Sequence, residues 1–310
     1  MNDASLLPAI HRVIDQVGTV ILGKRSQVRL AIACLLARGH LLIEDVPGVG
    51  KTTLAHAIAK SLGLDFHRIQ FTSDLLPADI LGVSVFEQST GRFTFHAGPI
   101  FRQLVLADEI NRSTPKTQSA LLEAMEEGQV SVEGAPRPLP SPFFVIATQN
   151  PVSLAGTFPL PESQLDRFLM RIGIGYPDPR AERLLLERSN EGDRGEKLQQ
   201  LLSVEDLRAM RTAANAVALS PLLLDYVQRL VAHTRQSAGF HFGLSPRGSI
   251  AIVRAARTWA WLEGRQHAVP EDVQAILPAV VEHRLRATTD GDGRTGAALA
   301  HRLLTEVDVF

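Results

Sequence analysis

The chain has 310 residues, enough for two domains on the usual scale of about 100 to 200 residues each. Its hydrophobic fraction of 45%, charged fraction of 21% and formal net charge of −1 are typical of a globular protein and exclude a disordered or fibrous chain. A near-neutral charge gives no electrostatic reason to expect nucleic acid as a partner. No apolar run approaches the roughly 18 residues of a membrane span, and the first residues lack the pattern of a secretion signal, so a cytoplasmic location is expected. The single cysteine, Cys34, excludes an internal disulfide.

Two amphipathic helices are predicted near the start of the chain. Apolar residues recur at helical spacing from residue 10 to 17 and from residue 28 to 36, and Gly18 and Gly39 follow the two patterns. The short segment Val20-Ile21-Leu22-Gly23 lies between them.

The stretch LLIEDVPGVGKTTL, residues 41–54, predicts a strand, a glycine-rich loop and the start of a helix. Glycines let the backbone N–H groups of such a loop turn toward phosphate oxygens, and the positive end of the helix dipole favours the same anion. Lys51 can reach the β- and γ-phosphates, and Thr52 can bind Mg²⁺. The generic pattern begins with glycine, where this chain has Asp45. We predict that a nucleoside triphosphate is bound by Val46, Pro47, Gly48, Val49, Gly50, Lys51, Thr52 and Thr53.

A strand and two hairpins are predicted after this helix. Residues 66–71 alternate between apolar and polar side chains, which indicates a strand. Residues 82–86 and 92–95 form two alternating runs around the turn EQSTG, which indicates a β-hairpin. A second hairpin is expected at residues 129–139, although the prolines in its second limb predict poor pairing.

A buried strand, residues 104–109, ends in two acids. Its nearly continuous apolar run fits the centre of a parallel sheet, and ligands bind at the carboxyl edge of such sheets. Asp108 can hold Mg²⁺ through water, and Glu109 can polarise the water that attacks the γ-phosphate. The alternative is a pair of strand-end acids that face solvent. The phosphate loop upstream in the same chain favours the catalytic interpretation.

A further strand is predicted at residues 143–148, after a helix that begins near Pro115 and ends at Gly128. The strand is followed by Gln149-Asn150-Pro151, so its polar end should lie at the same sheet edge. Asn150 could hydrogen-bond the attacking water or the γ-phosphate; as an alternative it is only a turn residue before Pro151.

Arginines occur at two further places of interest. Residues 165–171, LDRFLMR, place Arg167 and Arg171 one helical turn apart, and a guanidinium from a neighbouring subunit can stabilise a transferring phosphoryl group. Arg247 is expected in the first turn of a later helix, from which it could reach phosphates at a domain boundary. By itself neither pattern is specific, since most helical arginines are solvated or ion-paired.

Beyond the stiff segment YPDP, residues 176–179, the periodicity is helical to the end of the chain. Serines at 203, 220 and 245 are expected to cap three of these helices. The predicted helices cover residues 180–189, 204–217, 221–238, 246–262, 270–286 and 297–307.

Five segments together carry a resemblance to a known family. They are LADEINRSTPKTQSALLEAMEEG (106–128), EDVPGVGKT (44–52), FVIATQNP (144–151), LPESQLDRFLMR (160–171) and LSPRG (244–248). With them the chain resembles a MoxR-type AAA+ ATPase, from the clade with an extra hairpin inserted in helix 2. The resemblance covers nearly the whole chain, and the two predicted hairpins match the helix-2 insert and the hairpin before sensor 1.

The resemblance implies roles for individual residues. It makes Lys51 and Thr52 Walker A, Asp108 and Glu109 Walker B, Asn150 sensor 1, and Arg247 sensor 2. It places the arginine finger at Arg167, with Arg171 as the competing candidate. It also implies that Ile21, Leu22 and Gly23 contact adenine. Asp45 is usual in this family, and Gly248 is a minor departure from the common small residue alanine.

The expected fold is α/β: a P-loop AAA+ core with a central parallel sheet, residues 1–176, followed by a smaller all-α lid domain, residues 177–310. The resemblance implies an enzyme that hydrolyses ATP to ADP and phosphate with Mg²⁺, in a homo-oligomeric ring, expected to be a hexamer. It further implies chaperone-like work on protein clients, such as cofactor insertion or complex assembly, beside a partner with a von Willebrand factor A domain. Arg167 would act in trans.

Two other functions stay open at this point. Relatives in the same clade act on DNA, so a nucleic-acid motor or loader is the main alternative. The near-neutral charge disfavours it, as does the presence of only Arg92 and Arg137 as basic residues near the aromatic hairpin. A nucleotide-gated scaffold without hydrolysis is the third option, disfavoured because Glu109 is intact.

Overall fold

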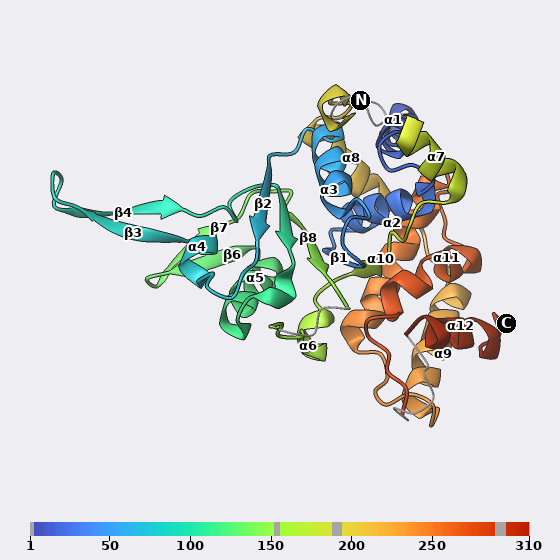
Figure 1. Cartoon of the computed structure of the whole chain (residues 1–310). Helices are drawn as coiled ribbons and strands as arrows, with labels where there is room; N and C mark the ends of the chain where they lie inside the picture. The colour runs from blue at the N-terminus through green and yellow to red at the C-terminus, as the bar shows by residue number, and fades with distance from the viewer. Residues whose placement is uncertain (1–2, 152–155, 188–193, 289–295, 310) are drawn as a thin grey trace.

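The computed structural model describes residues 3–151, 156–187, 194–288 and 296–309 (Figure 1). Five parallel strands form its central sheet, in the order β2-β5-β8-β1-β9. The strands are β1 (Leu41–Glu44), β2 (Phe66–Gln70), β5 (Leu104–Asp108), β8 (Phe144–Gln149) and β9 (Met170–Ile172). Because all five run in the same direction, their carboxyl ends meet at one edge, which carries the loops after β1, β5 and β8.

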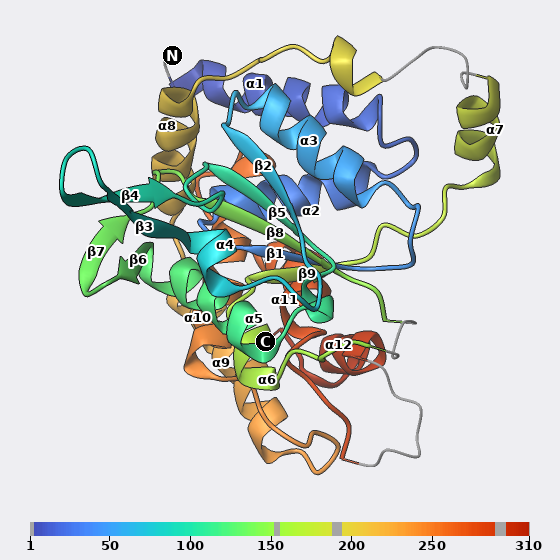
Figure 2. The same ribbon diagram turned by 60° about the vertical axis from the view of Figure 1, so that its left-hand side comes forward.

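Both faces of the sheet are buried, which explains the near-continuous apolar runs of its central strands. Alternate residues of each strand enter different cores: Leu106 packs with the helices on one face, and Val105 with those on the other. Figure 2 shows α1 and α3 on one side of the sheet and α4 and α5 on the opposite side. The helices around the sheet are α1 (Asp3–Gly18), α2 (Arg25–Leu36), α3 (Lys51–Ser61), α4 (Pro77–Leu81), the 3₁₀ turn η1 (Ile110–Arg112), α5 (Pro115–Glu127) and α6 (Glu162–Leu165).

Both predicted hairpins are present. The first, β3 (Gly82–Glu87) with β4 (Arg92–Ala97), projects as an arm from the body (Figure 1). The second pairs β6 (Gln129–Val132) with β7 (Ala135–Pro138), so the prediction of poor pairing was wrong. Pro136 and Pro138 are two residues apart and therefore turn their nitrogen atoms to the same side, which is compatible with an edge strand when that side faces away from its partner.

The described segments after residue 176 form helices, as predicted, with caps at Ser203, Ser220 and Ser245. Residues 188–189, the predicted end of the first of these helices, lie outside the described residues. The last helix but one ends at Val281 rather than Arg286, because the next residues turn to bring His283 and Arg284 onto the core. The elements are α7 (Pro179–Glu187), η2 (Arg194–Lys197), α8 (Val204–Asn215), α9 (Pro221–Gln236), α10 (Pro246–Leu262), α11 (Pro270–Val281) and α12 (Gly296–Glu306).

One strand was missed by the sequence analysis. Arg167 and Arg171 were expected on one helix. In the structure α6 ends at Leu165, before Arg167, and the chain then forms β9. This strand pairs with β1, where Met170 stands opposite Leu41. Three residues carry little periodicity, and the pairing with β1 decides their conformation. The two arginines therefore do not share a helix face.

A buried arginine fastens the helical part of the chain to the core. Arg284 is only 4% exposed, and it pairs with Asp166 at 2.7 Å while donating to the carbonyl oxygens of Phe168 at 2.6 Å and Leu169 at 3.2 Å. Ser245 donates to the other Asp166 oxygen at 2.8 Å. One hydrophobic cluster contains buried residues of both regions, so the helices after residue 176 pack on the core through apolar contacts as well. The exact division at residue 176 stays a prediction.

We expect Arg284→Gln to lower the free energy of unfolding by about 3 kcal/mol, because Asp166 loses its ion-pair partner and two carbonyl groups each lose a charged donor. The matched control is Arg286→Gln, which removes an arginine that is 60% exposed from its pair with Glu162. It should cost less than about 1 kcal/mol. Urea denaturation measures both, and equal losses would contradict a special role for Arg284.

Candidate functional site

The loop between β1 and α3 has the backbone of a phosphate cradle. Gly48 and Gly50 adopt φ of 83° and 96°, values that favour glycine, and Gly50 caps the N-terminus of α3. A Cβ at Gly48 would have no atom within 4 Å, so the loop is open on that side. Lys51 donates through Nζ to the carbonyl oxygens of Asp45 at 2.5 Å and Gln149 at 3.4 Å. Burial lowers the pKa of the Lys51 ammonium, against the opposing effect of nearby carboxylates, of which Asp45 has the largest effect.

Asp45, the residue that departs from the generic loop pattern, anchors the loop to the strand beside it. Its Oδ2 accepts the N–H groups of Ile174 at 2.7 Å and Gly175 at 2.5 Å, just after β9, and its Oδ1 accepts that of Val46 at 2.8 Å. A glycine could make none of these contacts. The carboxylate therefore fixes the loop to the chain that leaves the sheet.

The two acids at the end of β5 lie at the same sheet edge, as predicted. Asp108 is buried; its Oδ1 accepts from the Thr148 hydroxyl at 2.5 Å, and its Oδ2 from Arg68 Nη2 at 2.6 Å. Glu109 has a left-handed backbone, with φ 57° and ψ 47°, a conformation that is uncommon for a non-glycine residue and is often found at functional sites. Its Oε2 contacts Arg112 Nε at 3.1 Å and Gln70 Nε2 at 3.3 Å.

The predicted sensor and adenine segments also lie near the loop. Asn150 is half-buried and directly follows β8, the strand next to β1. The Ile21 side chain is buried, and its Cδ1 lies 3.5 Å from where a Cβ of Gly50 would stand. Gly23 has φ 72° and faces Asp178, so the segment runs between the phosphate loop and the start of α7. Leu22 is half-buried beside it.

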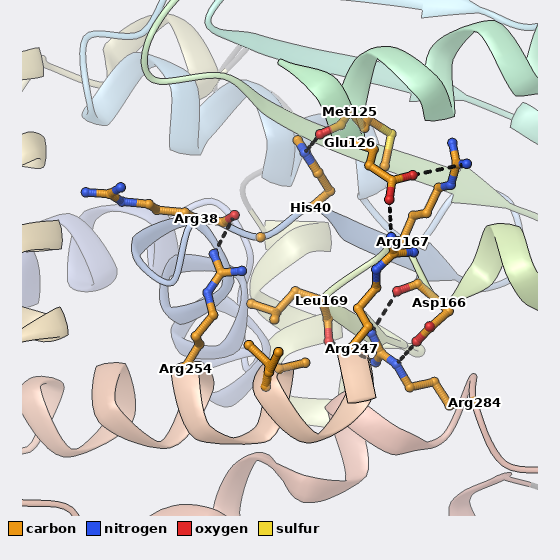
Figure 3. A pocket seen from close by; sticks show the side chains of 13 residues that line it. Arg38, His40, Met125, Glu126, Asp166, Arg167, Leu169, Arg247, Arg254 and Arg284 are labelled. Atoms are coloured by element: carbon orange, nitrogen blue, oxygen red, sulfur yellow. Dashed lines mark hydrogen bonds and ion pairs between the residues drawn. The ribbon is translucent and has the colours of Figure 1, made fainter. Parts of the chain in front are cut away.

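The other two predicted arginines lie at the opposite edge of the sheet. Arg167 precedes β9, and Arg247 is in the first turn of α10. Both pair with one carboxylate near the end of α5: Glu126 Oε2 lies 3.1 Å from Arg167 Nη2, and its Oε1 contacts Arg247 Nη2 (Figure 3). A cavity of about 400 Å³ is lined by these three residues and by His40, which precedes β1. In one chain, Arg167 and Arg247 are therefore not brought to Lys51.

Arg171 is held inside its own chain. It pairs with Glu44 at 3.0 Å and Glu282 at 3.3 Å, and only 22% of its side chain is exposed. Glu44 in turn accepts from Gln149 Nε2 at 2.9 Å. Arg171 thus joins the end of β1 to the residue after α11, a contact that explains its presence without a role toward a neighbouring subunit.

Comparison with known proteins identifies the family. Residues 40–170 match the model described as the ATPase family associated with various cellular activities, and residues 232–303 match the AAA lid domain. The chain is 44% identical over 306 residues to the protein YeaC of Bacillus subtilis, and the aligned region covers 98% of this chain and 96% of that protein. It is 42% identical over 296 residues to the chaperone MoxR1 of Mycobacterium tuberculosis, covering 93% and 78%. The chain belongs to the MoxR-type AAA+ ATPases.

A solved structure confirms the fold of this MoxR-type chain. The crystal structure of a candidate ATPase from Cytophaga hutchinsonii superimposes with a TM-score of 0.91 at 36% identity, covering 99% of this chain and 96% of that one. The predicted fold class, an AAA+ core with a parallel sheet followed by a lid, is therefore confirmed.

Four polar residues of this MoxR-type site were missed by the sequence analysis. Arg68 and Gln70 were interpreted only as the polar face of a strand, yet β2 pairs with β5 so that Gln70 stands opposite Asp108. Thr148 was assigned only to the strand before Gln149, although its hydroxyl contacts Asp108 and accepts the N–H of Glu109 at 2.9 Å. Glu126 was placed within a family segment but received no role. The strand order would have brought the first three together, since neighbouring parallel strands end side by side.

We expect Asp45→Gly, which restores the generic loop pattern, to destabilise this MoxR-type chain by about 2 kcal/mol and to weaken ADP binding, because three N–H groups lose their acceptor. Asp45→Asn keeps one acceptor oxygen and should lose less of both. Urea denaturation and ADP titration measure the effects. A glycine variant that binds ADP like the parent chain would show that the carboxylate does not organise the loop.

Proposed function

We propose that this MoxR-type chain hydrolyses ATP at the interfaces of a homo-oligomeric ring, a hexamer in the simplest case, and uses the cycle to remodel or mature protein clients. The observation that carries the proposal is the separation of two groups of residues. Lys51, Asp108, Glu109 and Asn150 gather at the carboxyl edge of the sheet, whereas Arg167 and Arg247 are paired through Glu126 at the amino edge. A complete site for phosphoryl transfer then requires two subunits.

The carboxyl-edge residues fit a nucleotide with Mg²⁺. No group of three or more metal-ligating side chains occurs in the described part of the chain, but Mg²⁺ is commonly held by one or two protein oxygens together with substrate phosphates. Thr52 and Asp108 would hold it, and the ion would neutralise charge on the phosphates. The loop residues 46–53 bind and orient the phosphates, with Lys51 as their cation, while Ile21, Leu22 and Gly23 contact the base.

Hydrolysis itself requires positioning and charge stabilisation more than covalent chemistry. Glu109 orients and deprotonates the attacking water, and Asn150 hydrogen-bonds that water or the γ-phosphate. Arg167 of the adjacent subunit stabilises the charge of the transferring group as the arginine finger, and Arg247 acts beside it, also in trans. Arg171 pairs with two carboxylates of its own chain, whereas Arg167 pairs with one carboxylate that it shares with Arg247, and this difference favours Arg167 for the role.

The family gives the class of client only in outline. A relative named as a chaperone supports work on proteins, and we extend this to a partner with a von Willebrand factor A domain, as the sequence resemblance implies. The hairpin arm supports a protein client over nucleic acid: Phe86 and Phe93 are 51% and 69% exposed, while the nearby Arg137 stacks on Phe95. ATPase assays with and without DNA test this choice. Strong stimulation by DNA would favour a nucleic-acid motor, and the absence of any turnover would favour a scaffold.

Among the described helices none could cross a membrane, and the cytoplasmic location stays a prediction.

We expect Glu109→Gln to bind ATP and to lose turnover by at least about 100-fold, since it removes the base but keeps the hydrogen-bonding shape. The variant should trap the ring with its client and allow affinity capture of a partner. The control is Glu127→Gln, the same replacement of a carboxylate by a carboxamide at an exposed residue of α5, and this variant should hydrolyse ATP normally. Normal turnover in Glu109→Gln would refute the assignment of the base.

We expect Arg167→Ala to keep nucleotide binding and to lose turnover by about 1,000-fold, the usual contribution of an arginine finger. Mixing this variant with Lys51→Ala should restore part of the activity, because some interfaces then combine an intact loop with an intact finger from the neighbour. Mixing Lys51→Ala with Asn150→Ala, whose defects lie at the same edge, is the matched control. Mixtures that stay inactive, or an Arg171→Ala variant with the same behaviour as Arg167→Ala, would contradict the proposed arrangement.

A further inference from the structure

A second arginine-lined cavity lies where α2 of the core meets α8 and α10 of the helical region. Its volume is about 240 Å³, and it is lined by four arginines together with Asn215 and Thr258. No aspartate or glutamate is among the described residues that line it. The four arginines are Arg38, Arg211, Arg254 and Arg257.

Within the described residues, the side-chain hydrogen bonds of two of the four arginines all go to the end of α2. Arg211 is buried and donates to the carbonyl oxygen of Leu35 at 2.8 Å and 3.2 Å, and Arg254 donates to the carbonyl oxygens of Ala37 and Arg38. These carbonyls form the negative end of the helix dipole, which favours cations. That end carries only about half an elementary charge, so it balances a fraction of the charge gathered there.

The other two arginines have no such partner. No hydrogen bond or ion pair of the Arg38 or Arg257 side chain is found within the described part of the chain, and Arg257 Nε is buried without an acceptor. Figure 3 shows the Arg38 side chain pointing away from Glu126 and Arg167. Its charge is therefore not directed at the carboxylate that holds the proposed finger.

The electrostatics of this cluster are unfavourable without an anion. Burial, together with the like charges of Arg38 and Arg254, lowers the pKa of Arg211 to about 10. Burial also lowers the pKa of Arg254, with Arg38 contributing in the same direction. Guanidinium groups that are partly removed from water are normally paired with carboxylate or phosphate.

We propose that this cavity binds a small phosphate anion, of the inorganic phosphate or pyrophosphate class, through Arg38, Arg211, Arg254 and Arg257. The chemistry follows from the guanidinium fork, which matches phosphate oxygens with two parallel hydrogen bonds. The size follows from the volume, since sites for drug-sized ligands are about 300 to 1,000 Å³ and this cavity is smaller. Asn215 and Thr258 add polar groups to the same wall. Bound there, the anion ties the end of α2 to α8 and α10.

The inference is independent of the proposed ATP site and can be tested without hydrolysis. The 310-residue chain with Lys51→Ala, in which the phosphate loop is disabled, is titrated by calorimetry with inorganic pyrophosphate and with inorganic phosphate. Its thermal midpoint is recorded with each anion. We expect saturable binding and a raised midpoint for at least one anion. Chloride at equal ionic strength should reproduce neither effect.

Variants in the same Lys51→Ala chain locate the site. Arg38→Gln and Arg257→Gln each remove a guanidinium that has no partner within the described chain, so the fold should persist while anion affinity falls about tenfold. Arg12→Gln removes an exposed arginine of α1 and is the control for charge. Arg167→Ala should bind as the parent does, because its cavity is the one beside Glu126. Unchanged affinity in both cavity variants, loss in Arg167→Ala alone, or no saturable binding would overturn the proposal.

Discussion

The structure depends on a parallel sheet that separates the phosphate loop from the arginines that could act on it. The phosphate loop follows the last residue of β1. His40, by contrast, directly precedes β1, and Arg167 lies just before β9. A strand of four residues is about 13 Å long, and an arginine side chain covers only part of that distance. One chain therefore holds the two halves of the proposed phosphoryl-transfer site at opposite edges of its sheet. In the proposed ring, assembly brings unlike halves together.

Each half is held in place by carboxylates whose two oxygen atoms contact different partners. In each case one oxygen contacts one segment of the chain and the other oxygen contacts a second segment, so a single side chain fixes two segments that are separate in the sequence. Asp108 is buried, Asp45 and Asp166 are half-buried, and Glu126 is exposed. Removing such a group leaves several donors without an acceptor. The four examples are Asp45 (Val46 and residues 174–175), Asp108 (Thr148 and Arg68), Glu126 (Arg167 and Arg247) and Asp166 (Ser245 and Arg284).

Much of the core was predictable because its signals are local. The phosphate loop is one continuous stretch, residues 45–51, and the two acids at the end of β5 are adjacent residues. Serine caps mark the beginnings of three later helices. What could not be predicted depends on contacts between distant segments. β9 is a strand only because β1 lies beside it, Arg68 reaches Asp108 only through the strand order, and Glu126 meets two arginines that follow it by 41 and 121 residues. Periodicity carries no information about such pairings.

The helix α5 physically joins the two halves. It begins six residues after Glu109, and Glu126 lies in its last turn. Its 13 residues span about 20 Å at 1.5 Å per residue, and a hydrogen-bonded helix is stiff over that length. A displacement at the Glu109 end therefore shifts Glu126, and with it the pairing of Arg167 and Arg247. In the proposed ring this end of α5 faces the next ATP site, so one helix is sufficient to connect the state of one site to the finger that serves its neighbour.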